Sequence, residues 1–120
     1  MIMNTNKPYD LEERTFEFAR DIRLFIKTLV KTTANIEDSK QLVRSSGSVG
    51  ANYIEANEKL SKKDFLFRLK ISRKEAKESV YWLRLIATTN DLGNIQKSKE
   101  LINEAIELKK ILSSIIDKSQ

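Results

Sequence analysis

The sequence predicts an all-α protein, an antiparallel up-down-up-down bundle of four helices. Apolar residues recur at helical spacing in four segments with recognisable ends, and no segment shows the alternation of a strand. One proline and three glycines in 120 residues offer little turn chemistry for a many-stranded fold. Because a chain of this length builds one core, we expect a single domain over residues 1–120, with helices at about 10–32, 36–58, 62–90 and 95–118.

The first predicted helix begins at Asp10, which can cap it, and Glu13 can reach back as in a capping box. The apolar residues that follow fall on one face at helical spacing. We expect this face to be buried; it consists of Leu11, Phe18, Ile22, Phe25, Ile26 and Leu29.

The second predicted helix has Asn35 as its cap. Residues 44–52 are rich in glycine and serine, which are poor helix formers, so we expect close packing against another helix to stabilise them. A phosphate cradle is the alternative, but the Walker pattern and a preceding strand are lacking. The expected inward residues are Leu42, Val43, Ser46, Val49, Gly50, Tyr53 and Ile54.

The third predicted helix has a strong start signal, with Ser61 as cap, Asp64 three residues later, and Leu60 and Phe65 spaced as a hydrophobic staple. Gly93 suits the left-handed conformation that ends many helices. The expected core residues of this helix are Phe65, Leu69, Ser72, Ala76, Ser79, Leu83 and Ala87. Those of the fourth helix are Leu101, Ala105, Leu108, Ile111, Leu112 and Ile115.

Large apolar residues also lie outside these core stripes. Four of them on the third helix are about 120° to 160° away from its core stripe, and two on the fourth are similarly displaced. An exposed apolar patch of this kind indicates a protein contact, and a homo-oligomer is the commonest form. The alternative is that Trp82 and Leu85 flank a wide core edge. The predicted oligomer interface comprises Phe67, Ile71, Trp82, Leu85, Ile102 and Ile106.

The chain has 22 basic and 17 acidic residues, a net charge of +5, and the surplus is concentrated in one stretch. Residues 59–77 hold eight basic and two acidic side chains. Several of the basic residues lie three or four positions apart, where like charges repel each other on a helix, and an anionic partner would relieve this repulsion. A solvated helix face is the plainer interpretation. The candidate nucleic-acid contacts are Lys62, Lys63, Lys70, Arg73, Lys74, Lys77 and Arg84.

The absence of cysteine and histidine excludes disulfides, thiol or Ser-His nucleophiles and the usual zinc sites. Five polar residues could meet between the second and third helices, and we expect them to form a structural network: Arg44, Asn52, Glu55, Glu75 and Glu78. The alternative is a hydrolase that uses the three glutamates with a divalent metal. We expect no catalytic residue, no metal and no cofactor.

No apolar run approaches the roughly 18 residues that a membrane span needs, and residues 1–8 lack the apolar block of a signal peptide. The sequence therefore predicts a cytoplasmic protein with no membrane partner.

Two stretches carry a family resemblance. Residues 44–56, with an arginine, a run of small residues and then Asn52 and Glu55, resemble the second-helix signature of small bacterial four-helix-bundle proteins. These proteins were first found encoded in intervening sequences of large-subunit ribosomal RNA genes. Residues 74–84 resemble the third-helix signature, and residues 64–65 and 112–116 also fit. Many members have glycine where this chain has Ala56, which implies a slightly later turn.

The resemblance implies an antiparallel bundle that assembles into a ring, with pentamers known in the family, and no established enzymatic activity. The related accessory variability proteins of diversity-generating retroelements are associated with a reverse transcriptase, and with nucleic acid through a basic ring surface. By this resemblance the anion contacts belong to the basic residues of the third helix, and the Asn52 and Glu55 signature belongs to packing contacts.

We therefore expect a non-catalytic homo-oligomer that binds RNA or DNA through phosphate contacts, without base readout. Phe67 and Tyr81 are the nearest aromatic residues to the basic ones, which is few for a stacking platform. The alternative is a protein-interaction scaffold that docks a partner such as a reverse transcriptase or another polymerase.

Overall fold

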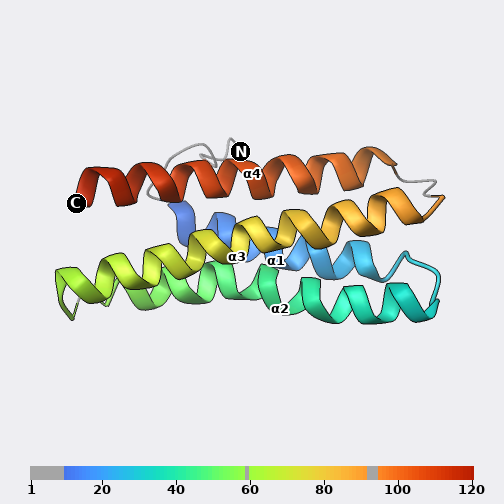
Figure 1. Ribbon diagram of the computed structural model, residues 1–120, viewed down its shortest axis with the longest axis horizontal. Coiled ribbons are helices and arrows are strands. Elements are labelled where there is room, and N and C mark those ends of the chain that lie inside the picture. The colour runs from blue at the N-terminus through green and yellow to red at the C-terminus, as the bar shows by residue number, and fades with distance from the viewer. Residues whose placement is uncertain (1–9, 59, 92–94) are drawn as a thin grey trace.

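The computed structural model describes residues 10–58, 60–91 and 95–120. These residues form four helices and no strand: α1 (Leu11–Ile26), α2 (Thr33–Ala56), α3 (Lys62–Thr89) and α4 (Ile95–Ser119). They pack as a bundle in which α1 contacts α2 and α4, while α3 contacts α2 and α4 (Figure 1). The all-α prediction is confirmed, and Gly93, the expected end of the third helix, lies outside the described residues.

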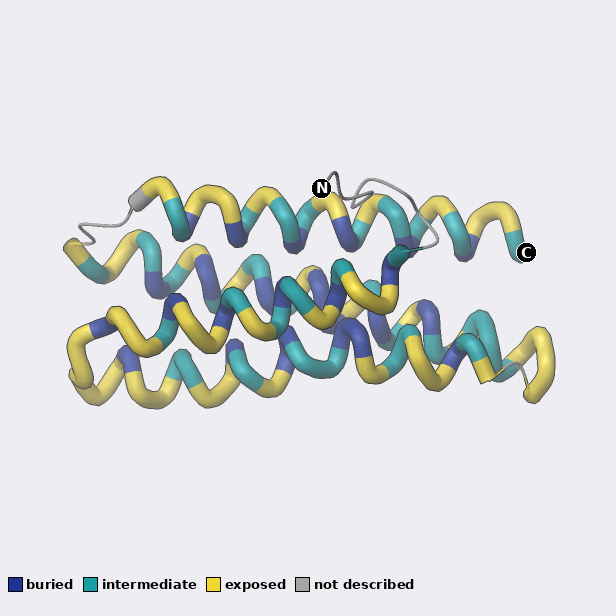
Figure 2. Tube along the Cα trace, turned by 180° about the vertical axis from the view of Figure 1, so that it is seen from behind, coloured by how far each residue is buried: buried dark blue, intermediate teal, exposed yellow. Residues whose placement is uncertain are grey.

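Buried residues recur along every helix at the spacing that the sequence predicts, and they turn toward the centre of the bundle (Figure 2). The expected core is confirmed for large apolar side chains such as Phe18, Leu42, Leu69 and Leu108. Ile54 is 47% exposed, which contradicts its expected place in the core. It lies about 120° around α2 from Leu42, outside the arc that the neighbouring helices cover.

Three buried apolar side chains lie outside the predicted core stripes, the small Ala56 of α2 and two large ones. Ile86 of α3 and Ile116 of α4 are both almost fully buried. Ile86 and Ile116 each lie within about 80° of the centre of the predicted core stripe of their helix. The buried arc of each helix is therefore wider than the predicted stripe. The core is therefore broader than a narrow seam, because each helix contacts two neighbours.

Helix α1 ends six residues earlier than predicted. After Ile26 the chain turns, and the Thr28 hydroxyl donates to the Phe25 carbonyl oxygen at 2.6 Å. A threonine side chain that bonds a nearby carbonyl competes with continuation of the helix. Leu29, which was expected on the helix, is buried in the connection instead.

The start of α2 is set by Thr32 and not by Asn35, which corrects the predicted cap. The Thr32 hydroxyl oxygen accepts from the Asn35 backbone N–H at 3.1 Å. The buried Asn35 side chain instead donates to the Val30 carbonyl at 2.8 Å, and it exchanges amide hydrogen bonds of 2.7 and 2.9 Å with Asn90. This amide pair ties the α1–α2 connection to the end of α3.

At the start of α3, Ser61 is the cap that the sequence predicts, with its hydroxyl accepting from the Asp64 backbone N–H at 3.0 Å. The expected staple is absent because Leu60 is 82% exposed. Asp10, the predicted cap of α1, makes no side-chain cap hydrogen bond. Helix α2 ends at Ala56, two residues earlier than expected.

Small residues on α2 bring it close to two neighbouring helices. A Cβ atom on Gly50 would lie 2.7 Å from the Thr15 hydroxyl oxygen of α1. Toward α3, the buried Ser45 and Ser79 hydroxyls lie 2.8 Å apart, and the Ser72 hydroxyl donates to the Val49 carbonyl at 2.6 Å. The expected close approach is confirmed, and the buried hydroxyl groups at this contact have partners, as buried polar groups require.

We expect Gly50→Ala to lower the free energy of unfolding by about 1–3 kcal/mol, because the new methyl overpacks against Thr15. Gly47→Ala is the matched control. Its Cβ would meet only the flexible end of Arg23, at 3.4 Å, so the helix propensity of alanine should raise stability by up to about 1 kcal/mol. Urea unfolding of both variants measures the difference. Equal stabilisation by both substitutions would contradict the close approach at Gly50.

Candidate functional site

The basic side chains of α3 line a surface hollow of about 370 Å³ that reaches across to α4. The α3 side supplies four cations, and α4 supplies Lys109 and Ser113. The guanidinium Nη1 of Arg73 donates to the Ser113 hydroxyl at 3.3 Å, which joins the two helices at the hollow. The four α3 residues that line it are Lys70, Arg73, Lys74 and Lys77.

The hollow is unbalanced in charge. No carboxylate lines it, and within the described part of the chain the one ion pair of its cations joins Lys74 Nζ to Glu75 Oε2, at 3.9 Å. Five cations that share one depression repel each other, and an anion placed among them is attracted by all five. Since their side chains are partly or fully exposed, salt will screen this attraction. The arrangement suits reversible contacts with phosphate groups.

The structure does not bring all the predicted basic residues together. Lys62 lines a different hollow, with Ser61, Phe65 and Ser119. Lys63 is exposed near the start of α3, and Arg84 is exposed seven residues beyond Lys77, which is about 10 Å along the helix. The predicted basic residues therefore divide into two groups. Four of them line the hollow, and the other three, Lys62, Lys63 and Arg84, lie farther along the helix in either direction.

Lys109 and Ser113 were missed by the sequence analysis. They lie four residues apart and so share one face of α4. That spacing was visible in the sequence, but the register of α4 against α3 was not. Only the packed bundle places this face beside the basic residues of α3.

A second polar cluster lies between α2 and α3. Arg44 forms ion pairs with Glu75, at 3.3 Å between Nη1 and Oε1, and with Glu78. The indole Nε1 of Trp82 donates to Glu78 Oε2 at 3.0 Å. This hydrogen bond, followed by that from Arg44, lowers the pKa of Glu78, while the Glu78 carboxylate raises the pKa of Arg44. Both groups are therefore held in their charged forms.

Glu75 is the most enclosed charge of this cluster. Its side chain is 7% exposed, and its Oε1 atom makes no hydrogen bond although Arg44 lies within ion-pairing distance. Such a carboxylate depends on its counter-charge, because breaking a buried pair leaves an uncompensated charge. These ion pairs of Arg44 with Glu75 and Glu78, called the clamp below, join α2 to α3.

Asn52 and Glu55 do not join this clamp, although the sequence grouped them with it. The Asn52 amide donates to the Ser48 carbonyl at 2.9 Å, and its oxygen accepts from Arg68 at 3.3 Å. Glu55 is exposed, whereas Glu75 and Glu78 pair with Arg44. In the residues that the structure describes, no group of three or more acidic side chains is placed to hold a metal ion.

The residues of the predicted oligomer interface differ in exposure. Phe67 is 57% exposed, whereas the other five are half-buried. Trp82 and Ile102 pack against the core of the bundle, as the wide-edge interpretation expects of Trp82. Phe67, Ile71, Leu85 and Ile106 are not part of that packing. Further exposed apolar side chains that the sequence analysis did not select include Phe16, Leu24 and Tyr81.

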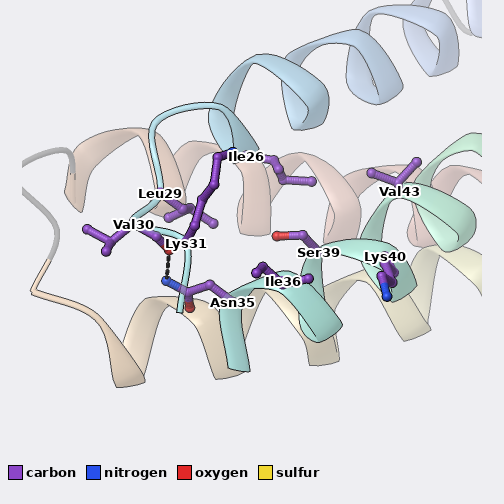
Figure 3. Close-up of a pocket in the computed structure, with 9 residues that line it drawn as sticks. All are labelled: Ile26, Leu29, Val30, Lys31, Asn35, Ile36, Ser39, Lys40 and Val43. Carbon is purple, nitrogen blue, oxygen red and sulfur yellow. Dashed lines mark hydrogen bonds between the residues drawn. The ribbon is translucent and has the colours of Figure 1, made fainter. Parts of the chain in front are cut away.

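An apolar groove of about 450 Å³ lies where the early end of α1 leaves the first turns of α2 uncovered (Figure 3). Leu29 and Val30 of the connection and Ile36 of α2 are among its lining residues, and the dashed line marks the hydrogen bond from Asn35 to the Val30 carbonyl. Lys31 and Lys40 are its charged lining residues. No carboxylate is among the described residues that line the groove. None of the predicted site residues lies in it.

A search of the described residues finds no helix with the length and hydropathy of a membrane span.

Comparison with known proteins identifies a family. Residues 8–114 match the model of a protein family whose description is "23S rRNA-intervening sequence protein". A crystal structure of a protein of unknown function, from the S23 ribosomal protein family of Bacteroides thetaiotaomicron, is similar to this chain with a TM-score of 0.81 and 35% sequence identity. The similarity covers 92% of this chain and 97% of that chain. No curated protein matches.

Proposed function

Because this chain belongs to the family of 23S rRNA-intervening sequence proteins, we propose that it is a non-catalytic, homo-oligomeric bundle that binds RNA or DNA through phosphate contacts. The observation that carries the proposal is the hollow between α3 and α4, which five cations line and no carboxylate does. The clamp of Arg44, Glu75 and Glu78 has a structural role in this account, since its charges are paired with each other.

The physics of phosphate binding fits this hollow. Lysine and arginine side chains that neutralise phosphates release condensed counterions, and this release supplies most of the sequence-independent affinity. Four of the five cations of the hollow are lysines. A lysine ammonium is a flexible point charge and lacks the planar pair of donors with which an arginine recognises the edge of a base. The expected binding is therefore non-specific in sequence and strongly dependent on salt.

Self-association would raise the overall affinity by providing several copies of this weak site. The exposed Phe67 and the half-buried Ile71, Leu85 and Ile106 lie outside the hydrophobic core cluster, and apolar side chains left partly exposed in this way are available for contacts between copies. We propose that bundles with an antiparallel, up-down-up-down helix order associate through these residues into a closed ring such as a pentamer. Each copy then presents one hollow, and simultaneous contacts raise the overall affinity for a long nucleic acid.

Replacing Lys70, Lys77 and Lys109 together by glutamine should weaken binding of a generic RNA or DNA, measured by fluorescence anisotropy across a salt series. If each lysine contacts one phosphate, the slope of log affinity against log salt should become shallower by about 2–3 per subunit, from 0.7–0.9 per contact. The control replaces three exposed lysines elsewhere, Lys27, Lys31 and Lys99, and changes the net charge equally.

Equal weakening by the two triple variants would show that net charge, and not the hollow, governs binding. No binding by the unmodified protein at low salt would overturn the nucleic-acid proposal and favour the scaffold that docks an acidic protein partner.

Phe67→Asp should shift the protein to smaller species in light scattering while circular dichroism still reports a helical fold. Phe67 is largely exposed in the subunit, so a charge there disrupts a contact between copies without a cavity in the core. Phe16→Asp on α1 is the control, because Phe16 is equally open and lies outside the proposed contact. An unchanged mass for Phe67→Asp, or a loss of mass for Phe16→Asp alone, would show that the contact is misplaced.

A further inference from the structure

We propose that the hollow between α3 and α4 takes single-stranded nucleic acid, with one base stacked on the ring of Tyr81. This inference rests on the proposed function and names its substrate class. The side chain of Tyr81 is 56% exposed and lies on the same helix as four of the five cations of the hollow.

Tyr81 lies beside the cations and not merely on the same helix. It follows Lys77 by four residues and Lys74 by seven, and it precedes Arg84 by three. At 100° per residue these four side chains fall within an arc of about 80° on the outer side of α3. Tyr81 is about 6 Å farther along the helix than Lys77. A base attached to a phosphate in the hollow is therefore within reach of its ring.

The ring of Tyr81 is also held in place by its neighbours. Its centroid lies 5.0 Å from that of Trp82, with the two planes at 80°, which is a favourable edge-to-face contact. Trp82 is anchored in turn by its hydrogen bond to Glu78 and by packing on the core. A ring that is already oriented loses less conformational entropy when a base stacks on it.

The aromatic ring is what distinguishes a single strand from a duplex. In a duplex the bases are stacked on each other, so an exposed tyrosine on the side of a helix finds no free base face. In a single strand the bases can splay out, and stacking on aromatic side chains is how proteins bind them without sequence preference. A duplex would still contact the lysines, but it would gain nothing from Tyr81.

The test compares a short oligouridine RNA, an oligothymidine DNA and a DNA duplex by fluorescence anisotropy at one low salt concentration. Tyr81→Leu should weaken binding of both single strands about fivefold or more, which corresponds to the lower end of the stacking energy per base, and leave duplex binding unchanged. Tyr81→Phe keeps the ring and should bind like the unmodified protein. Phe16→Leu, at an equally exposed aromatic on α1, controls for loss of a surface ring.

The outcomes separate this inference from the proposed function. If Tyr81→Leu binds single strands normally while the Lys70, Lys77 and Lys109 variant does not, the hollow binds phosphates alone and the stacking inference is wrong. Equal weakening on single strands and duplex, or a changed oligomer mass in light scattering, would also overturn it. If the unmodified protein binds none of the three probes, the proposed function itself fails. A loss confined to the RNA probe would support stacking with RNA as the ligand.

Discussion

The close approach of α2 to its neighbours is the constraint on which the rest of the bundle depends. At Gly50 there is no room for a side chain, because the helix backbone lies so close to Thr15 of α1. Between α2 and α3 the contacts are made by small serine side chains whose hydroxyl groups form hydrogen bonds. A helix interior that contains glycine is intrinsically weak, so the tertiary packing must stabilise it. Once α3 is fixed against α2 in this way, its basic residues are left to face outward and toward α4.

The serine contacts also set the register of α3 against α2, and the register decides which polar groups meet. Ser45 lies level with Ser79 and Val49 with Ser72. Arg44 is therefore placed beside Glu78, while Asn52, about 12 Å farther along α2, is placed beside Arg68. The clamp holds one edge of α3 against α2, and Arg73 with Ser113 joins the opposite edge to α4. The hollow and Tyr81 lie on the face between these two edges.

Sequence patterns within single helices predicted the helices and much of the core. Most of what they did not predict depends on how one helix is aligned against another. Helical periodicity predicted four helices and the large core side chains, Ser61 predicted the start of α3, and the family that the sequence suggested is confirmed. The early end of α1 depends on a hydroxyl of Thr28 that competes with the helix. Lys109 could not be assigned to the site because no pattern in one helix states which residue faces it from another.

The most direct test of the proposal that the hollow binds phosphate is the chemical reactivity of individual lysines, measured by mass spectrometry after acetylation with and without a bound oligonucleotide. We expect Lys70, Lys77 and Lys109 to be protected together, although they come from two helices, while Lys27, Lys31 and Lys99 stay reactive. Protection of Lys62 and Lys63 in their place, or a uniform change across all lysines, would contradict it.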